Sequence, residues 1–236
     1  MKSNERFIVF DVNETLLDIE VLNPFFHRNF GDERIMRQWF SELIIYSQSL
    51  TLSGRYTPFG QLAIAVLRMV ADIRSVTLAA TTVEEFRRLM ATLPPHPDVI
   101  PALEILKEAG FHMISLTNSS AQEGRNVLEK SGLTHYFEHQ FSVEESKRFK
   151  PAPEVYRNVC HALGVDASSL RLVAAHTWDI IGAMASGWKG TLVTRTGNAV
   201  LELGEQPDIT GKNLLTVAER IICTDVTWSA SLKTGD

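Results

Sequence analysis

The stretch FIVFDVNETLLD at residues 7–18 places an acidic residue, Asp11, directly after a run of four apolar residues. The run Phe7–Phe10 is short, continuously apolar and rich in β-forming residues, which is typical of a strand buried on both faces of a parallel sheet. A polar loop comes after Asp11. Backbone N–H groups of that loop and the amino end of the next segment can align the carboxylate, which suits a nucleophile.

Three more runs further along the chain have the same buried-strand character, and helical segments separate them. The apolar residues between Pro101 and Ala109 recur at three- and four-residue steps and stop at Gly110, as in a helix followed by glycine. The predicted strands cover residues 112–116, 170–175 and 190–194, and the predicted helices cover 101–109 and 179–186. This alternation predicts an α/β fold, a doubly wound parallel sheet with right-handed crossovers.

Polar residues directly follow three of the predicted strands. Ligands of doubly wound sheets bind beyond the carboxyl ends of the strands. The candidate site residues are therefore Asp11, Thr117, Asn118 and the segment His176–Asp179. Taken alone, Asp11 could merely cap a helix, but its place at the end of the first strand favours a functional role.

The segment between the first strand and residue 97 shows helical periodicity and no convincing buried strand. Examples are the apolar residues within 36–44 and 62–70. We predict a helical cap inserted over the site at residues 19–96, with a core domain formed by 1–18 and 97–236. Pro94–Pro97 would be a stiff return linker. Trp39, Phe40, Tyr46 and Phe59 are candidates to wall a small apolar pocket, although an ordinary cap core is the commoner explanation for such residues.

Composition narrows the classes of function. The 236 residues carry a formal net charge of −5 and no run of five like charges, which argues against a nucleic-acid surface or a polybasic membrane anchor. No apolar stretch reaches the roughly 18 residues of a membrane span, and the first strand begins too early to leave room for a signal peptide. We therefore expect a cytoplasmic protein, with Cys160 and Cys223 as buried free thiols in helical segments.

Four motifs in order resemble those of the haloacid dehalogenase superfamily. They are Asp11 with Thr15 and Leu16, then Thr117-Asn118, Lys150-Pro151 and Asp179. The resemblance covers nearly the whole chain. It implies a Rossmann-like core with an inserted helical cap and a hydrolase that uses Asp11 as nucleophile.

Two departures from the motifs of the superfamily's phosphatases indicate which branch of the superfamily the chain resembles. Its phosphatases usually carry a second aspartate two residues after the nucleophile and an acidic pair in the fourth motif, which helps to hold Mg²⁺. Here Asn13 and a lone Asp179 stand at those places, and an amide cannot act as acid and base. The strings Trp178–Ala183 and Lys150–Tyr156 are instead similar to those of the type II 2-haloacid dehalogenases, which work without metal or cofactor.

The mechanism that this resemblance implies begins with attack of Asp11 on the carbon that bears the halogen. Halide leaves with inversion and an aspartyl ester forms, while Lys150 keeps Asp11 ionised. Water then attacks the ester, with Asp179 or His176 as base. Predicted substrate or halide contacts are Asn13, Thr15, Thr117, Asn118, Tyr156, Trp178 and Arg55. Without the motif that runs from Lys150 to Tyr156, Lys150 would be interpreted as a solvated surface lysine.

The leaving-group pocket must differ from that of the dehalogenases it resembles. Those enzymes carry an arginine on the first cap helices, and the corresponding stretch at 46–52 has none. Arg55 is the candidate to reach in from the cap. Ala174 and His176 stand where a serine and an asparagine are expected, and His176 could be a base, a donor to halide or a structural group.

The leading prediction is metal-independent hydrolysis of short 2-haloalkanoic acids, with a preference for the S enantiomer. Two alternatives stay open: a Mg²⁺-dependent phosphatase of the same superfamily, and a non-catalytic binding protein on this fold. The partner is a small molecule, the 2-haloacid substrate, and not a nucleic acid or a membrane. The apolar cap helices offer a surface for a homodimer.

Overall fold

A parallel sheet of six strands forms the centre of the protein in the computed structural model, which describes residues 6–231. The strand order is β3-β2-β1-β4-β5-β6, and every neighbouring pair is parallel. The strands are β1 (Phe7–Phe10), β2 (His112–Thr117), β3 (His139–Ser142), β4 (Leu170–Ala174), β5 (Lys189–Val193) and β6 (Ile209–Gly211). The doubly wound α/β prediction is confirmed, with β1 at the centre.

The two strands that the sequence does not predict lie at the edges of the sheet. β3 has the sequence HQFS and is exposed or half-buried along its length, and β6 has only three residues. A strand that is covered on one side only, or is very short, does not need a continuous apolar run. The four strands that were predicted are the inner ones, which are apolar because helices cover both of their faces.

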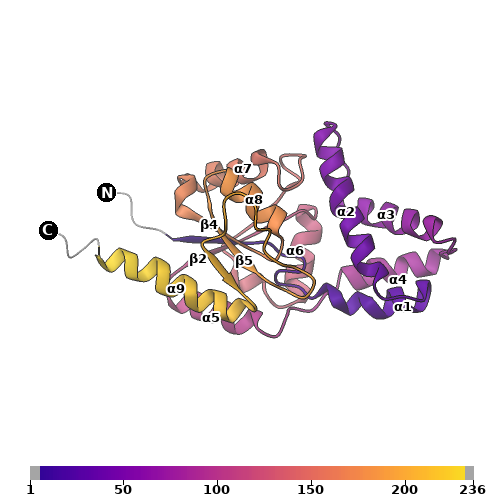
Figure 1. The fold of residues 1–236 in the computed structure, drawn as a ribbon, viewed down its shortest axis with the longest axis horizontal. Helices are drawn as coiled ribbons and strands as arrows, with labels where there is room; N and C mark the ends of the chain where they lie inside the picture. Colours follow the sequence, from indigo (N-terminus) through magenta and orange to yellow (C-terminus); the bar gives the residue numbers. More distant parts are fainter. Residues whose placement is uncertain (1–5, 232–236) are drawn as a thin grey trace.

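Helices cover both faces of this sheet (Figure 1). On one side lie α5 (Val99–Glu108) and α9 (Leu214–Ser231), and on the other lie α7 (Pro153–Leu163) and α8 (Thr177–Ala185). The remaining core helix, α6 (Ala121–Lys130), comes after β2 and begins with a capping box between Ser120 and Glu123. The expected helices at 101–109 and 179–186 are thus α5 and α8.

The cap consists of four helices that lie beside the core (Figure 1). They are α1 (Asn23–Phe30), α2 (Ile35–Leu52), α3 (Phe59–Ile73) and α4 (Ala80–Met90). Trp39 on α2 is fully buried and its indole N–H donates to the carbonyl of Ala63 on α3 at 3.0 Å, so this residue belongs to the cap core. The segment that leaves the core for the cap and the segment that returns from it lie side by side. Asp18 N donates to Pro94 O at 2.8 Å and His96 N donates to Leu16 O at 3.0 Å. This meeting point supports our proposed division into a core of 1–18 and 97–236 and a cap of 19–96.

Two smaller expectations have different outcomes. Cys160 on α7 is half-buried, but Cys223 on α9 is exposed, so the prediction of a buried thiol is wrong for Cys223. It faces away from the sheet on a helix whose inner face is formed by Leu214, Val217 and Ile221. Over the described part of the chain, no helix has the length and apolar character needed to cross a membrane. The expectation about a signal peptide concerns the first residues, of which 1–5 lie outside those described.

Gly182 allows α8 to pack very closely against the segment that carries Lys150. A Cβ atom at position 182 would lie 2.5 Å from Pro151 Cβ and 2.6 Å from the Tyr156 hydroxyl oxygen. Contacts this short require the neighbours to move. Gly182 therefore sets the distance between the start of α7 and α8.

We predict that Gly182→Ala destabilises the protein, although alanine in a helix is otherwise favoured over glycine by about 1 kcal/mol. Crowding against Pro151 and Tyr156 costs about 1–3 kcal/mol, which outweighs that gain. Denaturant unfolding would measure the change. Ile181→Ala, at an exposed neighbouring position on α8, is the control and should stay within about 0.5 kcal/mol of the wild type. A stabilised Gly182→Ala protein would contradict the close packing.

Candidate active site

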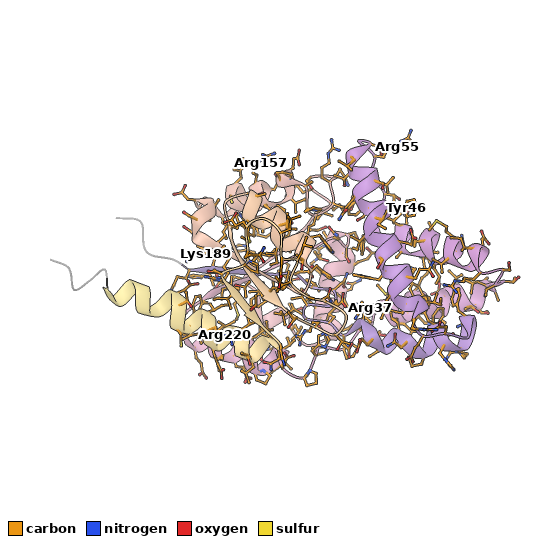
Figure 2. All side chains as sticks on the ribbon, viewed as in Figure 1. Arg37, Tyr46, Arg55, Arg157, Lys189 and Arg220 are labelled. Carbon is orange, nitrogen blue, oxygen red and sulfur yellow. The ribbon has the colours of Figure 1, made fainter. Side chains whose placement is uncertain are left out.

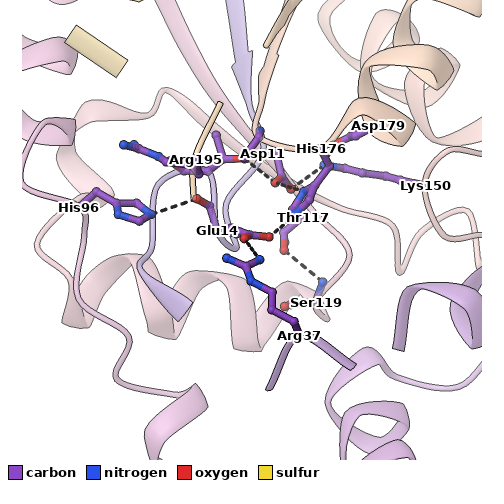
Figure 3. A network of polar contacts seen from close by, with 12 residues as sticks. Asp11, Glu14, Arg37, His96, Thr117, Ser119, Lys150, His176, Asp179 and Arg195 are labelled. Atoms are coloured by element: carbon purple, nitrogen blue, oxygen red, sulfur yellow. Dashed lines mark hydrogen bonds and ion pairs between the residues drawn. The ribbon is translucent and has the colours of Figure 1, made fainter. Parts of the chain in front are cut away.

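The carboxylate of Asp11 lies at the carboxyl end of β1 and is held by its own loop (Figure 3). Thr15 Oγ1 donates to Asp11 Oδ2 at 2.7 Å and accepts from Ala175 N, at the end of β4, at 2.8 Å. The hydroxyl hydrogen of Thr15 is therefore committed to Asp11. In this arrangement Thr15 orients the nucleophile, and its contact with substrate stays a prediction.

Lys150 is completely buried and lies between two carboxylates. Its Nζ donates to Asp11 Oδ1 at 3.0 Å and to Asp179 Oδ2 at 2.8 Å. The Tyr156 hydroxyl donates to Asp179 Oδ1 at 2.6 Å, so Tyr156 reaches the site through Asp179. Asn118 Oδ1 accepts from Lys150 N at 3.0 Å. The structure thus brings together residues that the sequence placed after three different strands.

Burial and charge set the protonation of this cluster. Burial alone would raise the pKa of Asp11, but the charges of Lys150 and His176 and the hydrogen bond from Thr15 hold it well below its usual value. Burial opposes the charge on Lys150, yet Asp11 and Asp179 raise its pKa. Burial raises the pKa of Asp179, and the negative charge of Asp11 adds to this rise. At neutral pH Asp11 is an ionised nucleophile, and Asp179 is the more basic carboxylate.

His176 is buried on the opposite side of Asp11, in contact with a second carboxylate. Its Nε2 lies 2.7 Å from Glu14 Oε2, and its Nδ1 lies 3.3 Å from Asp11 Oδ2. Arg37 of cap helix α2 pairs with Glu14 and also donates to the carbonyl of Thr196 at 2.6 Å. Burial lowers the pKa of His176, but Asp11 and Glu14 raise it to about 9. An imidazolium is a poor proton acceptor, which favours Asp179 over His176 as the base.

Glu14 and Arg37 are functional candidates that the sequence reasoning missed. Glu14 stands three residues after Asp11 in a loop where its backbone has φ 65°, a conformation that residues with side chains rarely adopt. Arg37 lies on a helix more than twenty residues away, and its pairing depends on how the cap packs. The acidic side chain of Glu14 so close to the nucleophile was the available signal, because a buried carboxylate there needs a cation.

Two aromatic rings enclose the imidazole of His176. Phe40 of α2 stacks on it with ring centroids 5.4 Å apart, and Trp178 stacks on it at 4.9 Å. Trp178 therefore supports His176. Of the four aromatic residues proposed as a pocket wall, Phe40 contacts the site and Phe59 lines a cavity beside it, whereas Tyr46 is exposed.

A cavity of about 180 Å³ opens between the cap and the core, and Asn13, two residues after Asp11, is part of its wall, whereas Asp11 itself does not line it. Asn13 and Ser119 provide polar groups at its wall, and Phe59, Ala63 and Ile64 of α3 provide apolar ones. Thr117 Oγ1 accepts from Ser119 N at 3.1 Å, so Thr117 shapes the loop that carries Ser119. Ser119 was not predicted, although it directly follows the Thr117-Asn118 motif.

Arg55 does not take part in this arrangement. It is exposed in the loop after α2, at the end of the cap helix that lies far from Arg37 (Figure 2). The prediction that Arg55 reaches the site is wrong: Thr51 and Tyr56 on either side of it contact Phe149 of the core, but the Arg55 side chain is exposed to solvent. Arg37, near the beginning of α2, is the cap arginine that contacts the cluster.

Comparison with known proteins identifies the family. Residues 6–187 match the family model described as haloacid dehalogenase-like hydrolase. The chain belongs to this family. The hydrolase is 34% identical over 194 residues to (S)-2-haloacid dehalogenase 1 of Pseudomonas sp. (strain CBS-3), covering 80% of this chain and 85% of the relative. It is 30% identical over 214 residues to the (S)-2-haloacid dehalogenase of Pseudomonas sp. (strain YL), covering 90% and 92%.

A solved structure shows the same architecture. The crystal structure of an L-2-haloacid dehalogenase has a TM-score of 0.88 and 25% sequence identity to the hydrolase, covering 92% of this chain and 98% of that one. The coverage includes the inserted cap as well as the core. The family resemblance that the motifs predicted is therefore confirmed.

The donor set of this hydrolase does not fit the Mg²⁺ that phosphatases of the superfamily use. The ammonium of Lys150 already contacts both Asp11 and Asp179, and the fourth motif supplies one carboxylate, Asp179, in place of an acidic pair. Within the described residues, no group of three or more His, Cys, Asp and Glu side chains is arranged to hold a metal ion. In this site, the ammonium of Lys150 is the cation that pairs with both carboxylates.

We predict that Lys150→Ala lowers the free energy of unfolding by about 3–5 kcal/mol at pH 7, because Asp11 and Asp179 lose their buried counterion. One of these carboxyls would then have a raised pKa, which destabilises the folded state more as pH rises. The loss should therefore be smaller at pH 5 than at pH 8. Chemical unfolding at both pH values tests this. Lys147→Ala, at an exposed lysine in the same segment, is the control, and an equal effect of both variants would contradict the prediction.

Proposed function

We propose that this hydrolase releases halide from short 2-haloalkanoic acids through an ester on Asp11, without a metal. The observation that carries the proposal is the ionised Asp11 carboxylate at the end of β1, held by the buried Lys150 ammonium at 3.0 Å. A carboxylate with a lowered pKa keeps its charge at neutral pH and can displace a halide from carbon. Relatives at about 30% identity carry the name (S)-2-haloacid dehalogenase, which supports the same substrate class and enantiomer here.

In the first step, an oxygen of Asp11 forms a bond to the carbon that bears the halogen. The carbon–halogen bond breaks, halide leaves with the electron pair, and an ester remains on Asp11. The cavity lined by Asn13, two residues after Asp11, has a volume of about 180 Å³, which suits a short aliphatic acid. We place the substrate against Asn13 and Ser119 on its polar side and against Phe59 and Ala63 on its apolar side.

In the second step, water attacks the ester carbonyl of Asp11 and gives up a proton. We assign this proton to Asp179, whose pKa is raised by burial and whose carboxylate shares Lys150 with Asp11. Tyr156 orients Asp179 through the hydrogen bond of 2.6 Å. The products are a 2-hydroxy acid, halide, a proton released to solvent and the regenerated Asp11 carboxylate. Lys150 contacts both carboxylates in the resting site.

The two alternative functions have weaker support. A phosphatase would need to bind Mg²⁺ at Asp11 and Asp179, and both of these carboxylates already contact the ammonium of Lys150. A binding protein would have no need for an aligned and ionised Asp11. We also propose a homodimer, supported by the exposed apolar side chains Ile45 and Leu52 on α2, and a cytoplasmic location, which remains a prediction from the sequence.

The test is halide release from 2-chloropropionate and fluoroacetate in excess chelator, beside hydrolysis of p-nitrophenyl phosphate with and without Mg²⁺. We expect chelator-resistant halide release that falls to background in Asp11→Asn, because an amide is no nucleophile. Asp32→Asn, on the exposed surface of the cap, should keep wild-type turnover. Phosphate release that depends on Mg²⁺, in the absence of halide release, would replace the proposal with the phosphatase alternative.

A further inference from the structure

The two oxygens of the Asp11 carboxylate have different surroundings. Oδ2 lies 2.7 Å from the Thr15 hydroxyl and 3.3 Å from His176 Nδ1, whereas Oδ1 is contacted by Lys150 Nζ at 3.0 Å. Each carboxylate oxygen has two lone-pair directions. Two donors therefore surround Oδ2, and Oδ1 keeps a lone pair for attack on carbon. In the resulting ester, Oδ1 bonds to the substrate and Oδ2 is the carbonyl oxygen.

His176 Nδ1 is a buried nitrogen that points toward Oδ2 without completing a hydrogen bond. The side chain is 4% exposed, and Nδ1 has no hydrogen-bond partner among the described residues. Buried polar atoms nearly always have a partner, so an exception needs an explanation. A donor that lies 3.3 Å from the resting carboxylate, but is not aligned with it, is explained if its bond forms during the reaction.

Glu14 fixes the other ring nitrogen of His176. Its Oε2 lies 2.7 Å from Nε2, and Arg37 from the cap pairs with its other oxygen, Oε1. Glu14 is 2% exposed and adopts φ 65°, which is unfavourable for a residue with a side chain. Strained backbone conformations cluster at functional sites. The strain at Glu14, beside the nucleophile, therefore indicates that the position of its carboxylate has a function.

The charges around His176 keep the imidazole protonated. Asp11 faces Nδ1 and Glu14 faces Nε2, with Arg37 behind Glu14 and Lys150 and Asp179 behind Asp11. The faces of the ring are covered by Phe40 and Trp178, which carry no charge. Burial lowers the pKa of His176, but the two carboxylates raise it to about 9. Both ring nitrogens are then donors at neutral pH.

We propose that Glu14 is a positioning residue that holds His176 as a cationic donor to Asp11 Oδ2, where it stabilises the oxyanion formed during hydrolysis of the ester. The inference rests on the proposed function. Water oxygen bonds to Cγ of Asp11, the carbonyl electron pair moves to Oδ2, and the proton of the water passes to Asp179. The oxyanion then re-forms the carbonyl, the Cγ–Oδ1 bond breaks, and the departing alkoxide takes the proton from Asp179. The second proton of the water stays on the new oxygen of Asp11 and is then released to solvent, which restores the carboxylate.

The role of Thr15 and His176 at Oδ2 is that of an oxyanion hole built from two side chains. Donors aimed at the position where charge develops stabilise the transition state because they do not have to reorganise. The charge on Oδ2 grows during the second step, whereas the first step removes charge from the Asp11 carboxylate. Loss of the donor at Oδ2 therefore slows ester hydrolysis and not halide release.

The test compares Glu14→Gly with Glu20→Gln. Glycine removes the carboxylate and suits the positive φ at position 14, so the backbone of the variant should be less strained. Glu20 is the matched control, because it also pairs with Arg37, at 3.4 Å, but does not contact His176. Rapid-quench measurement of halide from 2-chloropropionate and intact-protein mass spectrometry would follow the two steps separately.

We expect Glu14→Gly to release one halide per site in a burst near the wild-type rate and then turn over roughly 10- to 100-fold more slowly. The ester adduct on Asp11 should accumulate in this variant, and chloro and bromo substrates should give equal kcat values. His176→Gln should slow hydrolysis further, by about 10²–10³ relative to the wild type. Glu20→Gln should show neither a burst nor an adduct. A Glu14→Gly protein in which burst and steady state slow equally, without adduct, would overturn the inference.

A second measurement does not depend on turnover. NMR titration of the His176 ring should give a pKa of about 9 in the wild type and a lower value in Glu14→Gly. Because the active form is protonated, ester hydrolysis should decline as pH rises through that pKa, and the decline should begin at lower pH in the variant. A neutral His176 at pH 7 in the wild type would overturn the inference. Failure of the proposed function would be distinct, since the wild type would then give neither halide nor adduct.

Discussion

The buried ammonium of Lys150 is the interaction on which the rest of the site depends. A lysine with no exposed surface is stable only beside negative charge, and here two carboxylates lie within 3.0 Å of it. These carboxylates come from the end of β1 and the start of α8, and the lysine precedes α7. The sheet order, which places β4 directly beside β1, brings these segments together. Asn118 at the end of β2 completes the arrangement by fixing the backbone of Lys150.

The inner part of the fold could be predicted from the sequence because burial on both faces leaves a visible pattern. β1 is a continuous apolar run, β2, β4 and β5 are largely apolar, and the polar residues of the site come after β1, β2 and β4. The edge strands β3 and β6 leave no such pattern, since they are short or partly exposed. Helix positions in the cap were visible from periodicity, but their directions were not.

The same limit explains which site residues were missed. Asp11, Lys150 and Asp179 lie in motifs of the family, and each could be located from the residues next to it in the sequence. Glu14 and Arg37 owe their pairing to the way the cap packs on the core, which no local pattern records. Arg55 was predicted to reach the site, and Arg37 was not predicted, for the same reason. The position of Arg55 in the sequence gave no indication that its side chain is exposed to solvent.

The pairing of Glu14 with His176 also limits how this chain can diverge. If His176 were replaced by a neutral residue, the buried Glu14 would lose one of its two cations. If Glu14 were replaced first, the imidazole would lose the carboxylate on Nε2. A protein with only one of the two replacements is therefore less stable than a protein with both. The effects of the two replacements on stability depend on each other, which is epistasis. Among relatives, the two residues should be inherited together, and their joint presence would mark a distinct lineage of the family.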